Sequence, residues 1–211
     1  MAEPNYRQSP LSHLGFGGRI QDELGGADIG LSERDYRALI DIRVQLDKDP
    51  GAQESFKKAA GIELPRTPNS FTQGNDVEAL WLGPNEWQVV VHDNRSSAGG
   101  EWHGKLQNAM KSHFCSVVNI SNAQAILGLT GPMAREVLEG AVPLDMHPHS
   151  FKAGEVKQTL FGKHTGVTLQ LREEASNTFD IYCRRSFADY VWRYLESCAR
   201  GACANLAVLP A

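Results

Sequence analysis

The chain has 211 residues, of which 41% are hydrophobic and 22% are charged, a composition typical of a globular protein with a sizeable core. Its formal net charge of -4 argues against a nucleic-acid-binding surface, which requires a basic stripe. No apolar run is long enough to span a bilayer, and the first residues do not combine the charged and apolar segments of a secretory signal. We therefore expect a cytoplasmic protein that binds neither nucleic acid nor membrane.

Residues 1–33 are rich in glycine, proline and polar side chains and show little periodicity. Fixing the backbone of such a segment costs about 1–2 kcal/mol per residue in conformational entropy. Its few apolar side chains, such as Leu11 and Phe16, are not expected to offset that cost against the chain's own domain. We therefore predict an extended N-terminal arm over residues 1–33 that is either disordered or held by a partner chain.

The region that follows the arm alternates between strand and helix patterns. Ile40, Ile42 and Val44 alternate with polar neighbours, as in a half-buried strand, and residues 83–86 form a tight-turn sequence. The expected elements are a strand over 36–46, a helix over 54–60, strands over 79–82 and 87–92, and a helix over 101–113.

Residues 115–140 predict a strand–strand–helix unit. Alternating apolar residues on both sides of Ser121-Asn122 indicate a β-hairpin with its turn at that pair. Gly131-Pro132 suits a helix start, and Gly140 is placed for a left-handed C-terminal cap. Within this helix we expect Arg135, like Glu136 and Glu139, to face water.

Three further strands, over 156–161, 167–171 and 179–183, precede a final helix that ends at Gly201. Ser186 and Asp189 have the spacing of a capping box at the start of that helix. The order of elements is that of an α+β protein. We expect residues 34–211 to form two intimately packed modules of antiparallel sheet and helix, about 34–121 and 122–211.

The motifs that carry cofactor chemistry are incomplete in this sequence. GFGGRI (15–20) has Ile20 where a dinucleotide loop requires glycine, and no apolar strand precedes it. His147, His149 and Asp145 lie close together, but a metal site needs further ligands and a supporting shell. Residues 101–103 lack the spacing of a zinc-binding helix motif.

The candidate nucleophiles have simpler structural explanations. Ser186 and Ser121 are expected as helix cap and turn residue, and no nucleophile elbow occurs. Glu173-Glu174 is expected in a solvated turn. We expect buried free thiols at the four cysteines, Cys115, Cys183, Cys198 and Cys203. The residues therefore predict no catalytic, cofactor-binding or metal site in this chain.

The segments of the expected framework also carry a family resemblance. The segments are LWLGPNEWQVVV (80–91), VVNISNAQAILGLTGPMAREVLEG (117–140), PLDMHPHSF (143–151), QTLFGKHTGVTLQL (158–171) and FDIYCRRSFADYVWRYLESCA (179–199). In this order they resemble the gamma subunit of heterotetrameric sarcosine oxidase over about residues 34–200, and SPLSHL (9–14) is similar to the N-terminal arm of that family. They are more distantly similar to the folate-binding aminomethyltransferase fold of the glycine-cleavage T-protein.

The resemblance implies a complex of four chains that oxidatively demethylates sarcosine to glycine. The one-carbon unit passes to tetrahydrofolate, and electrons pass through FAD and FMN to oxygen, which gives hydrogen peroxide. In that family the alpha chain holds NAD and the folate site, the beta chain holds the flavins and the delta chain binds zinc. The gamma chain has no recognised cofactor or catalytic residue, so no site residue transfers to this sequence.

The resemblance leaves three functional hypotheses. We favour a non-catalytic gamma subunit that docks mainly on the alpha chain; the corresponding subunit of N-methylglutamate dehydrogenase is a close alternative. A stand-alone folate-dependent aminomethyltransferase or folate sensor would need a carboxylate aimed at the pterin ring, and the sequence nominates none. An adaptor of unrelated function is the third hypothesis.

Overall fold

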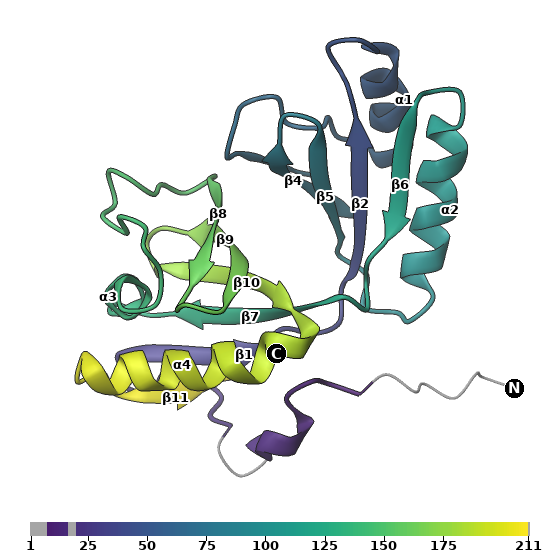
Figure 1. The fold of residues 1–211 in the computed structure, drawn as a ribbon. Helices are drawn as coiled ribbons and strands as arrows, with labels where there is room; N and C mark the ends of the chain where they lie inside the picture. The colour runs from purple at the N-terminus through teal and green to yellow at the C-terminus, as the bar shows by residue number, and fades with distance from the viewer. Residues whose placement is uncertain (1–7, 17–19, 211) are drawn as a thin grey trace, which may run out of the picture. The chain divides into compact units, whose positions relative to one another are not determined.

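The computed structural model describes residues 8–16 and 20–210, which fall into two compact units (Figure 1). Unit 1 combines the N-terminal segment up to Asp35 with residues 123–154 and 158–211. Unit 2 consists of residues 36–122 together with residues 155–157. The predicted α+β class is confirmed, because each unit contains a mainly antiparallel sheet and helices.

Unit 2 contains a five-stranded antiparallel sheet in the order β3-β4-β5-β2-β6. Its strands are β2 (Ala38–Val44), β3 (Phe71–Gln73), β4 (Val77–Gly83), β5 (Glu86–Val91) and β6 (Cys115–Asn119). Helices α1 (Gly51–Ala60) and α2 (Ala98–Met110) cover one face, because Phe56 of α1 and Leu106 of α2 join the same core as Ile40 and Ile42 of β2. The apolar residues whose alternation predicted β2 thus fill this core.

Unit 1 contains a six-stranded sheet in the order β11-β1-β7-β10-β9-β8. Its strands are β1 (Ile29–Glu33), β7 (Gln124–Thr130), β8 (Val156–Phe161), β9 (Thr165–Glu173), β10 (Thr178–Arg184) and β11 (Leu206–Val208). The α-helices are α3 (Ala134–Glu139) and α4 (Ala188–Gly201), and the short 3-10 helices are η1 (Ser12–Leu14) and η3 (Arg185–Phe187).

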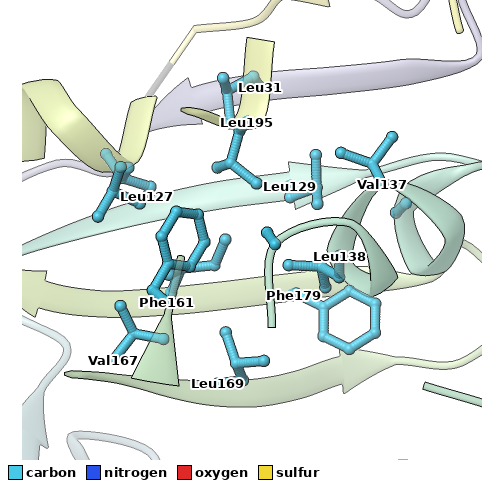
Figure 2. Close-up of a cluster of buried hydrophobic side chains, with 14 of the residues drawn as sticks. Leu31, Leu127, Leu129, Val137, Leu138, Phe161, Val167, Leu169, Phe179 and Leu195 are labelled. Atoms are coloured by element: carbon cyan, nitrogen blue, oxygen red, sulfur yellow. The ribbon is translucent and has the colours of Figure 1, made fainter. Parts of the chain in front are cut away.

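The core of unit 1 joins residues from the strands and from both α-helices. Figure 2 shows Leu127 and Leu129 of β7 near Val137 and Leu138 of α3 and Leu195 of α4. All five side chains are fully buried. At about 25 cal/mol per Å² of apolar surface removed from water, such clusters supply the main driving force for folding.

The predicted hairpin at Ser121-Asn122 is wrong. β6 pairs with β2 in the sheet of unit 2, whereas β7 pairs with β1 and β10 in the sheet of unit 1. Ser121 instead fastens the chain where it leaves β6, because its Oγ accepts a hydrogen bond from the Leu39 N–H at 3.0 Å. Alternating apolar residues identify two strands but do not say which strands pair.

The helix within residues 115–140 also differs at both ends. α3 begins at Ala134, with Met133 at the N-cap and no side-chain capping bond. Gly131 has φ +121°, and a Cβ there would lie 2.5 Å from the carbonyl oxygen of Asp28, so it serves a tight turn against the chain before β1. Gly140 has φ -70°, so it is not a left-handed cap.

The predicted capping box of α4 does not form. Ser186 lies in η3, Phe187 occupies the N-cap, and neither helix has a side-chain capping bond. Asp189 instead accepts a hydrogen bond from Arg193 Nε at 2.9 Å and lies 2.7 Å from His13 Nε2. The 3-10 turn before α4 takes up the residues that a capping box would have used.

Much of the expected arm is ordered against unit 1. Residues 29–33 form β1 between β7 and β11, and Leu11 is fully buried in the core of unit 1. The ring of Phe16 lies 4.5 Å from that of Trp192, centroid to centroid. The entropy argument counted Leu11 and Phe16 but not the ladder hydrogen bonds that β1 makes with β7 and β11. Residues 17–19 of the GFGGRI segment lie outside the described residues.

Candidate functional site

The loop that contains His147 and His149 follows α3. The two rings stack with centroids 5.1 Å apart, and His147 Nδ1 accepts a hydrogen bond from the His149 N–H at 3.2 Å. Asp145 turns to the backbone, because its Oδ1 accepts from the His147 N–H at 2.9 Å. Within residues 8–16 and 20–210, no group of three or more His, Cys, Asp or Glu side chains is placed to hold a metal ion.

Arg135 was predicted to face water, but its buried side chain binds the backbone of this loop. Its Nη1 donates to the carbonyl oxygens of Met146 at 2.7 Å and Phe151 at 3.1 Å, and its Nε donates to Asn177 Oδ1 at 2.7 Å. The residue is 8% exposed, and the guanidinium lies 5.5 Å from the centre of the Phe179 ring. Arginine is rarely buried without such partners, so Arg135 positions the loop and is not a solvated helix residue. The hydrophobic periodicity of α3 did not indicate that Arg135 would be buried.

A second constellation joins three side chains that the sequence did not connect. His113 Nδ1 lies 2.7 Å from Asp49 Oδ2, and His113 Nε2 lies 2.9 Å from Ser55 Oγ. Asp49 precedes α1, Ser55 lies within α1, and His113 lies between α2 and β6. The order serine, histidine, carboxylate is the hydrogen-bond pattern of a hydrolytic triad.

The surroundings of Ser55 do not complete such a triad. Ser55 is the fifth residue of α1, so its own N–H belongs to the helical hydrogen-bond ladder and cannot serve as an oxyanion donor. The α1 residue Gly51 lies against the imidazole, since a Cβ at that position would meet His113 Cε1 at 3.4 Å. The triad pattern therefore fixes the first turns of α1 to the end of α2 in unit 2, and we assign it a structural role.

A third cluster lies in the sheet of unit 1. Asp180 is 1% exposed, and its two oxygens accept hydrogen bonds from Arg34 Nε and Arg172 Nε, each at 2.8 Å. Gly128 leaves room for this arrangement, because a Cβ there would lie 2.5 Å from Arg34 Cζ and 2.6 Å from Ser32 Oγ. Each oxygen of the carboxylate thus accepts a hydrogen bond from one guanidinium group.

The remaining candidates also have structural partners. Glu101 pairs with Arg95, whose Nη2 lies 3.0 Å away, and His103 Nε2 lies 3.1 Å from the carbonyl oxygen of Val117. Residues 101–103 therefore do not converge on one point. Glu173 accepts a hydrogen bond from Ser176 Oγ at 2.7 Å in the exposed turn between β9 and β10.

The cysteines are free thiols, but not all of them are buried. Burial, with a smaller contribution from the Glu33 carboxylate, raises the pKa of the Cys183 thiol to about 12. Burial also raises the pKa of the half-buried thiols Cys115 and Cys198. Cys203 is exposed beyond the end of α4, which corrects the expectation for that residue. A raised pKa reduces the thiolate fraction, so none of the three shifted cysteines is poised as a nucleophile.

Unit 2 contains a pocket of about 430 Å³ at one end of its sheet. The pocket is bounded by the end of β2, the turn between β4 and β5, and the first residues of β6. Arg43 and Glu86 on its rim pair with each other, with Nη2 and Oε1 2.6 Å apart. The lining combines apolar surface with an internally paired charge, which suits contact with another molecule better than acid–base chemistry.

Solved structures place this fold in a known class. It matches the glycine cleavage system aminomethyltransferase T from Bartonella henselae with a TM-score of 0.66 at 15% identity, covering 96% of this chain and 59% of that chain. It matches a chain of heterotetrameric sarcosine oxidase from Corynebacterium sp. U-96, solved in complex with pyrrole 2-carboxylate, with a TM-score of 0.78 at 24% identity, covering 92% and 95%. The predicted aminomethyltransferase-like α+β fold is confirmed.

Sequence comparison assigns the family within that class. A family model described as sarcosine oxidase, gamma subunit family matches residues 46–201. Sarcosine oxidase subunit gamma from Corynebacterium sp. (strain U-96) is 24% identical over 192 residues, which is 90% of this chain and 88% of that relative. The chain belongs to the sarcosine oxidase gamma subunit family, and the resemblance stated from the sequence is confirmed.

Proposed function

We propose that this chain is the non-catalytic gamma subunit of a heterotetrameric sarcosine oxidase. The observation that carries the proposal is the family match over residues 46–201, which runs through elements of both units. The side-chain clusters described above support the non-catalytic role. Arg135, Asp180 and His113 each make hydrogen bonds to residues of their own unit. We assign no catalytic, cofactor-binding or metal residue to the chain.

The chemistry belongs to the partner subunits in this proposal. The complex oxidatively demethylates sarcosine to glycine, transfers the one-carbon unit to tetrahydrofolate and produces hydrogen peroxide. NAD and the folate site lie in the alpha subunit, FAD and FMN in the beta subunit, and zinc in the delta subunit. The gamma chain docks mainly on alpha and contributes contact area.

Stand-alone folate chemistry receives no support from unit 1. A pterin ring requires a carboxylate that can accept its N–H groups. Asp180 is the deeply buried carboxylate of the unit 1 sheet, and both of its oxygens already accept from arginines. The paired Asp180 carboxylate therefore gives no support to a folate site in unit 1.

We also propose that the complex works in the cytoplasm. Over the described part of the chain, no helix has both the length and the apolar character that crossing a membrane requires. The formal net charge of -4 gives no basic surface for nucleic acid.

Affinity purification of the tagged chain from its native cells tests the proposed function. We expect three further subunits in the eluate, a flavin absorption spectrum, and hydrogen peroxide production on addition of sarcosine. Parallel assays with N-methylglutamate separate the sarcosine oxidase assignment from the dehydrogenase alternative. Purification of the chain alone, with micromolar affinity for tetrahydrofolate, would contradict the proposal.

A further inference from the structure

Two exposed apolar side chains belong to β6 and to the residue before it. Phe114 is 98% exposed immediately before β6, and Val118 within the strand is 46% exposed. Along β6, residues separated by an even number of positions point to the same face, so Val118 shares a face with Ser116, which lines the pocket, opposite the core-facing Cys115 and Val117. Large exposed apolar groups that lie together mark interaction surfaces more often than isolated ones do.

The pocket of unit 2 adjoins Phe114. Phe114 lines it from one side, and Pro84 in the turn between β4 and β5 lines it from another. A volume of about 430 Å³ accommodates one large side chain from a partner. An apolar pocket beside an exposed aromatic ring is the arrangement found at the energetic centre of protein interfaces.

The backbone of β6 restricts how a partner can bind. β6 is an edge strand with β2 on one side, and the Ile120 N–H donates to Leu39 O at 2.9 Å. Since alternate residues of an antiparallel strand face the partner strand, Val117 presents its backbone groups to the outer edge. His103 of α2 already reaches the Val117 carbonyl, 3.1 Å from its Nε2. A full added strand is therefore blocked, and a partner must bind through side chains.

The charges on the pocket rim select the chemistry of that partner. Arg43 Nη2 lies 2.6 Å from Glu86 Oε1, and Arg43 Nε lies 3.2 Å from Asp41 Oδ2. One guanidinium thus serves two carboxylates, so this group of three side chains carries one net negative charge. A cation beside the exposed Phe114 ring would gain from both the net charge and the aromatic face.

We propose that this surface, formed by Phe114, Val118 and the adjoining pocket, docks a companion subunit through one apolar side chain next to a lysine or arginine. The apolar side chain fills the pocket beside Pro84. The basic side chain lies over Phe114 and faces Glu86. This inference rests on the proposed function and assigns the subunit contact to unit 2.

The test uses the complex purified with the tagged full-length chain. Phe114→Ala removes the exposed ring, and Leu160→Ala is the matched control, because Leu160 is 60% exposed on β8 of the other sheet. We expect the Phe114→Ala chain to dissociate from the complex at least about tenfold faster than wild type, as for an interface hot spot. The Leu160→Ala chain should dissociate at the wild-type rate. Both variants should keep the wild-type melting temperature as isolated chains.

A charge variant tests whether the partner contributes a basic side chain. Glu86→Gln removes the net negative charge, so the complex should dissociate several-fold faster at low salt, and added salt should reduce the difference from wild type. If the Glu86→Gln complex dissociates at the wild-type rate at all salt concentrations, the inference of a basic partner side chain is wrong.

The outcomes separate this inference from the proposed function. If wild type recovers the flavin-bearing subunits and Phe114→Ala dissociates at the wild-type rate, the docking surface is wrong and the proposed function stands. If wild type recovers no companion subunit, the proposed function fails, and the docking inference falls with it. If the isolated chain forms a dimer that Phe114→Ala disrupts, the occupant is a second copy, which also overturns the inference.

Discussion

The two units have similar architecture but use their polar and apolar side chains differently. In unit 1 two buried charged residues connect separate segments, because Asp180 binds two arginines and Arg135 supports a loop. Unit 2 also buries a carboxylate, that of Glu78, which lies 3.8 Å from His92 Nε2.

Unit 2 exposes Phe114 and Val118 beside a pocket. Unit 1 also exposes Leu160, but the most exposed aromatic ring and the pocket beside it both lie in unit 2. We therefore infer that unit 2 offers the stronger candidate contact surface.

The largest expected effect is in unit 1, at the buried carboxylate. Asp180→Ala leaves two arginine side chains, 25% and 17% exposed, without their shared partner. We expect a loss of about 3–5 kcal/mol in the free energy of unfolding, measured by urea denaturation, because a broken buried pair leaves uncompensated charge. Glu174→Ala in the neighbouring exposed turn is the control and should change stability by less than about 0.5 kcal/mol. A stable Asp180→Ala chain would break the contrast between the units.

The second effect concerns the segment before β1. Leu11 is fully buried in the core of unit 1, so Leu11→Ala should cost about 2–5 kcal/mol in the isolated chain. Denaturation of the isolated chain measures this cost. If the substitution is neutral there and destabilising only in the complex, a partner chain and not unit 1 holds this segment.

A smaller effect is expected in unit 2 at the Ser55–His113–Asp49 pattern. Ser55→Ala removes one hydrogen bond to His113 and should lower the free energy of unfolding by about 1–2 kcal/mol. The exposed neighbour Ser112→Ala is the matched control and should be near neutral. Hydrolysis of an activated ester by wild type, lost in Ser55→Ala, would refute the structural role of this pattern.

The smallest effect is expected for the stacked histidines of unit 1. Alanine at both His147 and His149 removes side chains whose described contacts stay within their own loop. Flavin reduction by sarcosine in the assembled complex should therefore remain within a few-fold of wild type. A loss beyond tenfold with assembly intact would mean that the loop contributes directly to the reaction.

Local periodicity predicted most elements but not their pairing. Alternation identified β2, β5 and β8–β10, and the apolar stripe of α4 gave the last helix. The same rule joined β6 and β7 in a hairpin, although they belong to different sheets. β1 was missed because Gly30 interrupts its apolar pattern, and its partners β7 and β11 are distant in sequence. Pairing depends on long-range contacts that a short sequence window does not contain.

The side-chain clusters were less predictable than the elements. Asp49, Ser55 and His113 come from three separate parts of unit 2, and their spacing matches no motif. Arg135 looked like a solvated residue, because one helical turn carries no information about the loop that closes over it. The exposure of Phe114 was likewise not predictable from its residue type, because phenylalanine is usually buried.

The central claim is that this chain supplies contact area and that its partners supply the reactive groups. Sarcosine-dependent hydrogen peroxide production, measured for the chain alone and for the complex that co-purifies with it, tests this claim most directly. We predict turnover by the complex and none by the isolated chain. Turnover by the isolated chain, accompanied by a bound flavin or pterin, would contradict the account.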